Sequence, residues 1–193
     1  MAKVPFTVSA RTAMLIGQEN FSNPEGAIVE LVKNAYDADS SCCYILFDLS
    51  DSETKSLYII DSGCGMTMDT IETCWMRIGT DDKLLNAYSP TGRVKSGAKG
   101  IGRFALNRLG KEAQMLTRRA DNPALLWSVD WNAFTRPGIN VDDITADIEE
   151  ISISVINDKI ARINEQFEVD IPSFSTGTIL QVTSLSDNWS DNQ

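Results

Sequence analysis

Apolar and polar residues alternate along the chain in patterns that predict several helices and strands. Asn23, Pro24 and Glu25 are typical of a helix start, and the apolar spacing that follows predicts a helix from about Pro24 to Asp39. Two β-rich runs, Cys42–Leu49 and Ser56–Asp61, predict a hairpin. The remaining predicted elements are helices over 68–77, Ile101–Leu109 (closed by Gly110) and Asp158–Gln166, and strands over Ala113–Arg118, Leu125–Val129, Ile151–Val155 and Thr178–Thr183. Residues 79–102 are rich in Gly, Ser, Asp and Lys and indicate a long loop.

The order of these elements predicts an α+β fold, in which helices cover one face of a mixed, largely antiparallel sheet. A chain of 193 residues that is 42% hydrophobic suits one domain with a sizeable core, so we expect residues 1–193 to form one domain. Trp189 lies in a polar tail with no apolar residue after it to pack on. We therefore expect an N-terminal fragment of a longer multidomain protein.

Composition and charge exclude several classes of function. The net charge of −10 argues against binding of nucleic acid by bulk electrostatics, so a nucleic-acid partner is uncertain. The absence of histidine excludes His–carboxylate triads, imidazole metal sites and a phospho-accepting histidine within this chain. The cysteines form no CxxC pair, which favours reduced thiols. No apolar run approaches a membrane span, and the start lacks a secretory signal, so we expect a cytoplasmic protein.

Basic residues are concentrated in one part of the chain. Between positions 93 and 119 they are Arg93, Lys95, Lys99, Arg103, Arg108, Lys111, Arg118 and Arg119, with Glu112 as the only acid. Residues 141–170 are strongly acidic. Both runs are compatible with solvated surface, and the basic run is also compatible with an anion site.

The first predicted helix carries polar residues at the edge of its apolar face. At about 100° per residue, Asn34 and Asp37 fall near +40° and −20° from Glu30, a wedge of roughly 60°. The apolar stripe beside this wedge contains Ala27, Ile28, Leu31, Val32, Ala35 and Ala38. Carboxylates at such a rim can face a semi-buried cavity, although an ordinary amphipathic helix can show the same pattern.

The segment D-S-G-C-G-M, residues 61–66, follows the second strand of the hairpin. Asp61 at a strand end can accept a hydrogen bond from an exocyclic amine and so recognise adenine. Gly63 and Gly65 allow close backbone approach, and Met66 can pack on a base. A plain glycine turn remains the alternative.

Two later segments are also candidates. S-G-A-K-G-I-G-R-F-A, residues 96–105, has Gly97, Gly100 and Gly102 before an apolar helix, with Lys99 as a cation. Backbone N–H groups exposed there can bind anions, although a flexible hinge explains the same glycines. The segment matches neither a Walker A loop nor a dinucleotide fingerprint. The fourth segment, S-T-G-T-I-L-Q-V at 175–182, is compatible with a plain strand start.

In order and spacing these four segments resemble the GHKL ATPases, the group of gyrase, heat-shock chaperones, histidine kinases and MutL. E-x-x-x-N-A-x-D-A (30–38) matches the first motif and D-x-G-x-G-M (61–66) the second. The glycine loop at 97–102 matches the third, and G-T at 177–178 the fourth. The resemblance covers roughly residues 9–185.

This resemblance implies a Bergerat-type two-layer α/β sandwich that binds ATP with Mg²⁺. Glu30 would be the general base for the attacking water, Asn34 would bind Mg²⁺, and Asp37 would support the pocket. Asp61, helped by a water and Thr178, would bind the adenine amino group, and Gly63 and Gly65 would let the base approach. The phosphates would be bound by main-chain N–H groups of Gly97, Lys99, Gly100, Ile101 and Gly102. Residues 79–100 would form a lid.

Particular residues indicate which branch of the GHKL ATPases the chain resembles most. Glu30 and the pair Asp37-Ala38 favour the ATP-hydrolysing branches over the histidine kinases. N-A-Y-D-A-D is similar to the MORC ATPases, and W-M-R-I-G-T-D-D-K (75–83) with A-K-G-I-G-R-F-A is similar to prokaryotic stand-alone GHKL proteins. The G-F-R-G-E-A pattern of MutL is absent at 97–105.

The resemblance therefore predicts a Mg-dependent ATPase, slow as an isolated domain, that acts as a nucleotide-gated conformational and dimerisation switch, as chaperone-like relatives do. ATP and ADP are the expected ligands. The expected partners are a second copy through the N-terminal region and downstream domains of the same chain, without a membrane. A histidine-kinase-type ATP-binding domain and a non-hydrolysing ATP-binding scaffold remain the alternatives.

Overall fold

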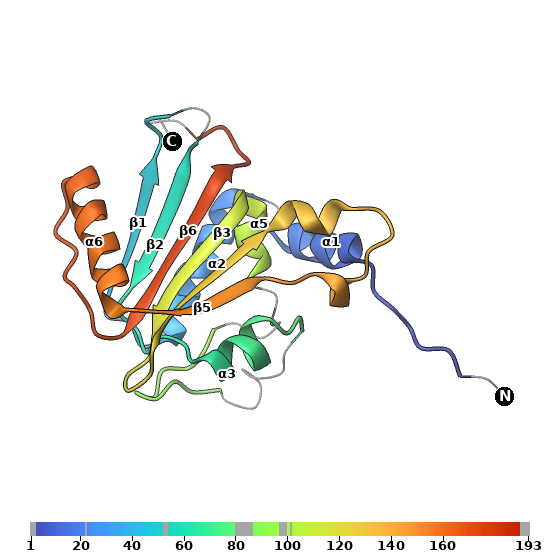
Figure 1. The fold of residues 1–193 in the computed structure, drawn as a ribbon, viewed down its shortest axis with the longest axis horizontal. Helices are drawn as coiled ribbons and strands as arrows, with labels where there is room; N and C mark the ends of the chain where they lie inside the picture. Colours follow the sequence, from blue (N-terminus) through green and yellow to red (C-terminus); the bar gives the residue numbers. More distant parts are fainter. Residues whose placement is uncertain are drawn as a thin grey trace.

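A six-stranded antiparallel sheet forms the centre of the computed structural model, which describes residues 3–21, 23–51, 54–79, 87–96, 100 and 102–189 (Figure 1). The strand order is β1-β2-β6-β3-β4-β5, and every neighbouring pair is antiparallel. The strands are β1 (Cys43–Asp48), β2 (Ser56–Asp61), β3 (Gly110–Arg118), β4 (Ala124–Asp130), β5 (Asp147–Ile151) and β6 (Gly177–Leu185). The predicted α+β fold with a largely antiparallel sheet is therefore confirmed.

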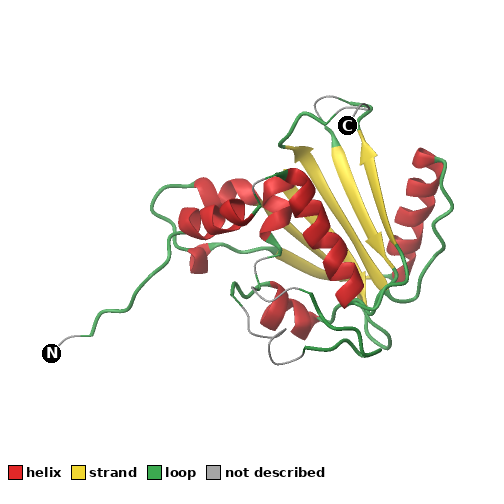
Figure 2. Cartoon of the chain, turned by 180° about the vertical axis from the view of Figure 1, so that it is seen from behind, coloured by secondary structure: helices red, strands yellow, loops and turns green. Residues whose placement is uncertain are grey.

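The main helices lie on the two faces of this sheet. They are α1 (Ala10–Asn20), α2 (Pro24–Asp37), α5 (Phe104–Leu109) and α6 (Ile153–Phe167). The short helix α3 (Met68–Thr70) continues into the π-helical turn η1 (Ile71–Trp75), and the 3-10 turns are η2 (Trp131–Thr135) and η3 (Val141–Asp143). Figure 2, the view from behind, shows helices lying across the sheet.

Alternating strand residues supply two separate cores. Leu57 and Ile59 of β2 point into the larger core, where they meet residues of α1, α2 and α5. Tyr58 and Ile60 point to the opposite face and pack with Ile156 and other residues of α6. Because β2 is buried on both sides, its sequence is a near-continuous apolar run.

Several predicted elements agree closely with the structure. The helix predicted from Pro24 ends at Asp37, two residues earlier than expected. The hairpin is present, with Cys43 paired to Asp61 and Asp48 paired to Ser56. Gly110 follows α5 as expected, but its φ of −164° is extended, so it begins β3 instead of forming a left-handed cap.

Two predictions near residue 151 are wrong. The strand ends at Ile151, and α6 starts at Ile153, well before the predicted start at Asp158. Ser152 explains the difference, because its hydroxyl accepts a hydrogen bond from the Ser154 N–H and so caps the helix. The alternation of Ile151, Ile153 and Val155 resembles a strand, but the cap begins the helix.

Helix α1 was not predicted. It starts after Ser9, whose hydroxyl accepts a hydrogen bond from the Thr12 N–H at 3.2 Å. Its buried face includes Ala10 and Ala13, which are 0% and 3% exposed. Small side chains give a weak apolar periodicity, so this helix is hard to recognise from the sequence.

The C-terminal segment is also packed more firmly than expected. The ring of Trp189 lies 4.7 Å from the ring of Phe47 in β1, centroid to centroid. Lys55 Nζ donates a hydrogen bond to the Trp189 carbonyl oxygen at 2.9 Å. The expectation that Trp189 has nothing to pack on is therefore wrong.

Candidate functional site

Helix α2 carries the polar wedge, and Gly102 lies against it. Its N-terminus is capped by Asn23, whose side chain accepts a hydrogen bond from the Gly26 N–H at 2.7 Å. A Cβ atom at Gly102 would lie 3.4 Å from Asn34 Nδ2 and 3.7 Å from Glu30 Oε1. Residues far apart in sequence thus meet, and Gly102, the last glycine of the glycine segment at 97–102, lies directly against the wedge.

The three polar residues of the wedge differ in burial. Glu30 is half-buried, and its Oε2 lies 3.5 Å from Nζ of Lys33 on the same helix. Asn34 is also half-buried. Asp37 is buried, and its Oδ1 accepts hydrogen bonds from the Ser96 N–H at 2.8 Å and the Ser96 hydroxyl at 3.2 Å. Asp37 therefore ties α2 to the residue immediately before the glycine segment.

Asp61 forms a second buried acidic position, at the end of β2. Its side chain accepts a hydrogen bond from the Gly63 N–H at 2.8 Å. Burial raises the pKa of the Asp61 carboxyl from 3.8 to about 6, although the Gly63 hydrogen bond acts in the opposite direction. In register, Asp61 lies between Cys43 of β1 and Thr178 of β6. A buried carboxylate with few donors around it is suited to a ligand that brings its own donor.

The two glycines after Asp61 are required by the protein's own packing. A Cβ atom at Gly63 would lie 2.6 Å from the Ala38 carbonyl oxygen. Gly65 has a φ of +64°, and a Cβ atom there would lie 2.0 Å from the Arg118 carbonyl oxygen. Both positions exclude any side chain.

The two ends of the predicted lid meet at Gly100. Its carbonyl oxygen accepts hydrogen bonds from the Gly79 N–H at 3.3 Å and from Arg103 Nη2 at 3.2 Å. Gly100 has a φ of 62°, which favours glycine. The candidate residues Gly97, Lys99 and Ile101, like residues 80–86 of the lid, lie outside the described residues.

Comparison with known proteins identifies the family. The family described as "Histidine kinase-, DNA gyrase B-, and HSP90-like ATPase" matches residues 21–163. The chain belongs to this family. It is also 33% identical over 100 residues to the mouse protein "MORC family CW-type zinc finger protein 3". That match covers 51% of this chain but only 10% of the mouse protein.

Membership of this ATPase family confirms the resemblance found in the sequence, and it supports nucleotide binding and ATP hydrolysis in general. Not one helix in the described part of the chain is long and apolar enough to cross a membrane.

Sequence analysis missed one buried residue that joins two of the motifs, the segment at 61–66 and the one at 177–178. The hydroxyl of Thr117 in β3 accepts a hydrogen bond from the Met66 N–H at 3.0 Å and donates one to the Gly177 carbonyl oxygen at 3.1 Å. It also lies 3.1 Å from the hydroxyl of Thr178, its partner in register on β6. Thr117 is fully buried. The sequence offered little signal for this residue, because β3 contains several other polar residues and the partners of Thr117 depend on strand register.

Several residues of the basic run have structural partners. Both terminal nitrogens of Arg108 bond the Asp187 carboxylate, and Arg118 Nη1 donates to the Ser175 carbonyl oxygen at 2.6 Å. Burial lowers the pKa of Arg103 to about 10, and its Nη2 donates to the Cys74 carbonyl oxygen at 2.9 Å. Among the residues that the structure describes, Arg103 Nε and Nη1 have no partner. Local folding therefore accounts for much of this run.

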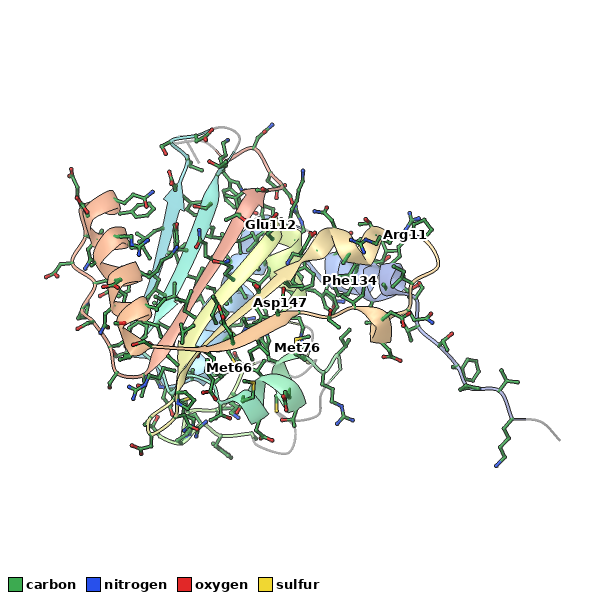
Figure 3. All side chains as sticks on the ribbon, viewed as in Figure 1. Arg11, Met66, Met76, Glu112, Phe134 and Asp147 are labelled. Atoms are coloured by element: carbon green, nitrogen blue, oxygen red, sulfur yellow. The ribbon has the colours of Figure 1, made fainter. Side chains whose placement is uncertain are left out.

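A separate polar groove lies on the α6 face of the sheet. Its volume is about 410 Å³, and its lining includes Glu112, Asp130, Arg136 and Asp147. In Figure 3, Glu112 and Asp147 lie along the strands, whereas Met66 lies toward the end of the sheet near α3. Of the candidate site residues that the structure describes, none lines this groove.

Proposed function

We propose that this chain binds ATP with Mg²⁺ and hydrolyses it, as a nucleotide-gated conformational and dimerisation switch. The observation that carries the proposal is the approach of Gly102 to Glu30 and Asn34, which brings a backbone suited to phosphates against a carboxylate and an amide. Asp61, at the end of β2 and opposite Thr178 of β6, supplies a second acidic position. Membership of the family supports nucleotide binding in general, and the roles of individual residues are part of the proposal.

At the adenine end, the Asp61 carboxylate accepts a hydrogen bond from the exocyclic amine, and Thr178 assists through a water. Met66 packs against the base plane. Gly63 and Gly65 keep the adjoining backbone free of side chains. The burial of Asp61 supports this role, because a desolvated carboxylate gains more from a matched donor than an exposed one does.

At the phosphate end, backbone N–H groups of Gly97, Gly100, Ile101 and Gly102, with the Lys99 ammonium, bind the phosphate oxygens. Asn34 holds Mg²⁺ through its amide oxygen, and Glu30 takes the proton of the attacking water. Asp37 supports the pocket through Ser96.

The available ligands fit magnesium that is shared with a nucleotide. In the described ranges no group of three or more Asp, Glu, Cys or His side chains could hold a metal ion. Magnesium usually keeps several waters and takes one or two protein ligands plus substrate phosphates, so a single amide from Asn34 fits that pattern. When bound, the ion would neutralise charge that develops on the phosphates.

The switch is supported by the contacts of the lid and of the N-terminus. Gly79 and Gly100 are joined by a hydrogen bond, so the two ends of the predicted lid already meet. Residues 3–7 extend away from the body of the protein (Figure 1), and Phe6 there is fully exposed. This arm is our candidate contact for a second copy, and we place the protein in the cytoplasm.

Glu30→Gln tests the catalytic assignment. We expect Mg-ATP binding by titration calorimetry to be retained and phosphate release to fall about 100-fold or more, because the general base is lost. Glu25→Gln, an exposed acid in the first turn of the same helix, is the control and should leave turnover unchanged.

Unchanged turnover in Glu30→Gln removes Glu30 as the base. A wild-type chain that does not bind Mg-ATP refutes the proposed function, whereas one that binds without turnover indicates the non-hydrolysing scaffold. Transfer of labelled phosphate to protein would indicate the kinase alternative.

A further inference from the structure

A second acid at the C-terminal end of α2 binds the segment that leads into the glycine loop. Asp39 has a φ of 63°, a left-handed conformation that is uncommon for residues with a side chain. Its carboxylate accepts hydrogen bonds from the hydroxyls of Ser89 and Thr91, both at 2.5 Å, and from the Thr91 N–H at 3.1 Å. One side chain thus holds two residues that lie about fifty positions further along the chain.

Arg93 strengthens the same attachment. Its Nη1 donates to the carbonyl oxygens of Tyr36 at 3.2 Å and Ser40 at 2.7 Å. Its Nε lies 3.7 Å from Asp39 Oδ1, and its guanidinium lies 5.0 Å from the centre of the Tyr36 ring. A cation is favourable here, because carbonyl groups at the end of a helix carry partial negative charge.

The segment held by Asp39 and Arg93 has its own internal hydrogen bonds. The Ser89 N–H donates to the Arg93 carbonyl oxygen at 2.8 Å, and the Lys95 N–H donates to the Ala87 carbonyl oxygen at 2.9 Å. Tyr88 and Val94 form an antiparallel bridge. We call residues 87–96 the docked hairpin. Its last residue, Ser96, is bound by Asp37, so the hairpin contacts α2 at more than one point.

We propose that Asp39 is a positioning residue for nucleotide binding, which acts by holding the docked hairpin on the helix that carries Glu30 and Asn34. This inference rests on the proposed function. With the hairpin docked, Ser96 is held on α2 by Asp37, and Gly102 lies against Glu30 and Asn34 of the same helix. Backbone that is already held in place loses less freedom when a ligand binds, so docking prepares the phosphate end before the nucleotide arrives.

Asp39→Asn is the variant of choice. Asparagine tolerates the left-handed conformation and has nearly the same size, so the backbone should be retained. The amide keeps one acceptor oxygen for the hydroxyls of Ser89 and Thr91, and its NH₂ group then faces the Thr91 N–H, from which the second carboxylate oxygen accepted. Glu168→Gln is the matched control, because Glu168 is an exposed acid with a φ of 52° at the end of α6, on the opposite face of the sheet.

Two readouts are needed. Hydrogen exchange of residues 87–96 without nucleotide should accelerate in Asp39→Asn and stay unchanged in Glu168→Gln. The Kd and KM for Mg-ATP should rise roughly five- to tenfold, because fewer molecules hold the competent arrangement, while kcat at saturation stays within about twofold. Arg93→Lys should shift both readouts in the same direction, and it replaces Asp39→Asn as the test variant if Asp39→Asn does not fold.

The possible outcomes separate this inference from the proposed function. Faster exchange with unchanged KM means that the hairpin is only structural and overturns the inference, as does unchanged exchange in both variants. If the wild-type chain fails to bind Mg-ATP, the proposed function and this inference fall together. If the wild type binds and only the KM prediction fails, the inference alone falls.

Discussion

The buried carboxyl of Asp61 should lower the stability of the protein while it serves binding. The residue is 8% exposed, and burial raises its pKa from 3.8 to about 6. At pH 7.5 the group is ionised in both the folded and the unfolded states, and its charge then costs the folded state about 3 kcal/mol relative to the unfolded chain. Asp61→Asn removes this charge while its amide oxygen can still accept the Gly63 N–H.

The pH dependence follows from the direction of this change. Because the folded-state pKa lies above the unfolded one, the unfolded chain releases its proton first as the pH rises. The contribution of Asp61 to stability therefore falls between about pH 4 and pH 6 and stays low above that range. Asp61→Asn should not show this pH dependence of stability. At pH 7.5 we expect its free energy of unfolding to exceed that of the wild type by about 1–3 kcal/mol.

Urea denaturation of the nucleotide-free protein between pH 4.5 and 8 measures this difference. Asp147→Asn, an exposed acid on β5, is the control for loss of one negative charge. Calorimetry should then show ATP affinity reduced at least about tenfold in Asp61→Asn, because an amide NH₂ opposes the adenine amino group. For the wild type, ATP affinity should rise as the pH increases through about 6, as Asp61 ionises.

If Asp61→Asn is less stable than the wild type at pH 7.5, the buried charge of Asp61 does not destabilise the folded state, and the reasoning is refuted. Equal ATP affinity in the two proteins would remove Asp61 from adenine recognition. An equal loss for GTP would point to general damage of the pocket, since guanine carries an oxygen where adenine carries the amine.

Two further substitutions test the packing around the site. Thr117→Val should lower the free energy of unfolding by about 1–3 kcal/mol, because the Met66 N–H and the Gly177 carbonyl oxygen lose a buried partner. Urea denaturation measures this difference, and an unchanged free energy of unfolding would contradict the role of the hydroxyl. Gly65→Ala should cost roughly 2 kcal/mol or more, since φ is +64° and a Cβ would overlap the Arg118 carbonyl oxygen. A melting temperature unchanged from wild type would contradict this prediction. Gly138→Ala is the control: Gly138 is exposed, with a φ of 77° and open space around it, so this variant measures the cost of the backbone conformation without steric overlap.

Local patterns in the sequence were sufficient for some parts of the fold and not for others. Helix α2 was recognisable because its cap, its first-turn proline and its apolar stripe agree with one another. The hairpin was recognisable because β2 is apolar on both faces. Helix α1 was not, since alanines carry its buried face, and α6 was placed too late because the cap at Ser152 stands inside a strand-like alternation.

The same distinction applies to the candidate site. Residues on one helical face, such as Glu30, Asn34 and Asp37, can be grouped by counting turns. The contacts of Thr117 and Asp39 could not be found that way. They join residues about fifty or more positions apart, and they depend on strand register and on a backbone angle that the chain pattern does not reveal.

By itself, the sequence determined the motif set, the predominance of antiparallel strands and the family to which the chain belongs, because each depends on spacing within one element or on the order of elements. Only the tertiary structure decided that Gly102 lies against the helical wedge, that burial raises the pKa of Asp61, and that Asp39 holds the docked hairpin. These properties arise from desolvation and from contacts between distant segments, which exist only once the sheet and its helices have packed.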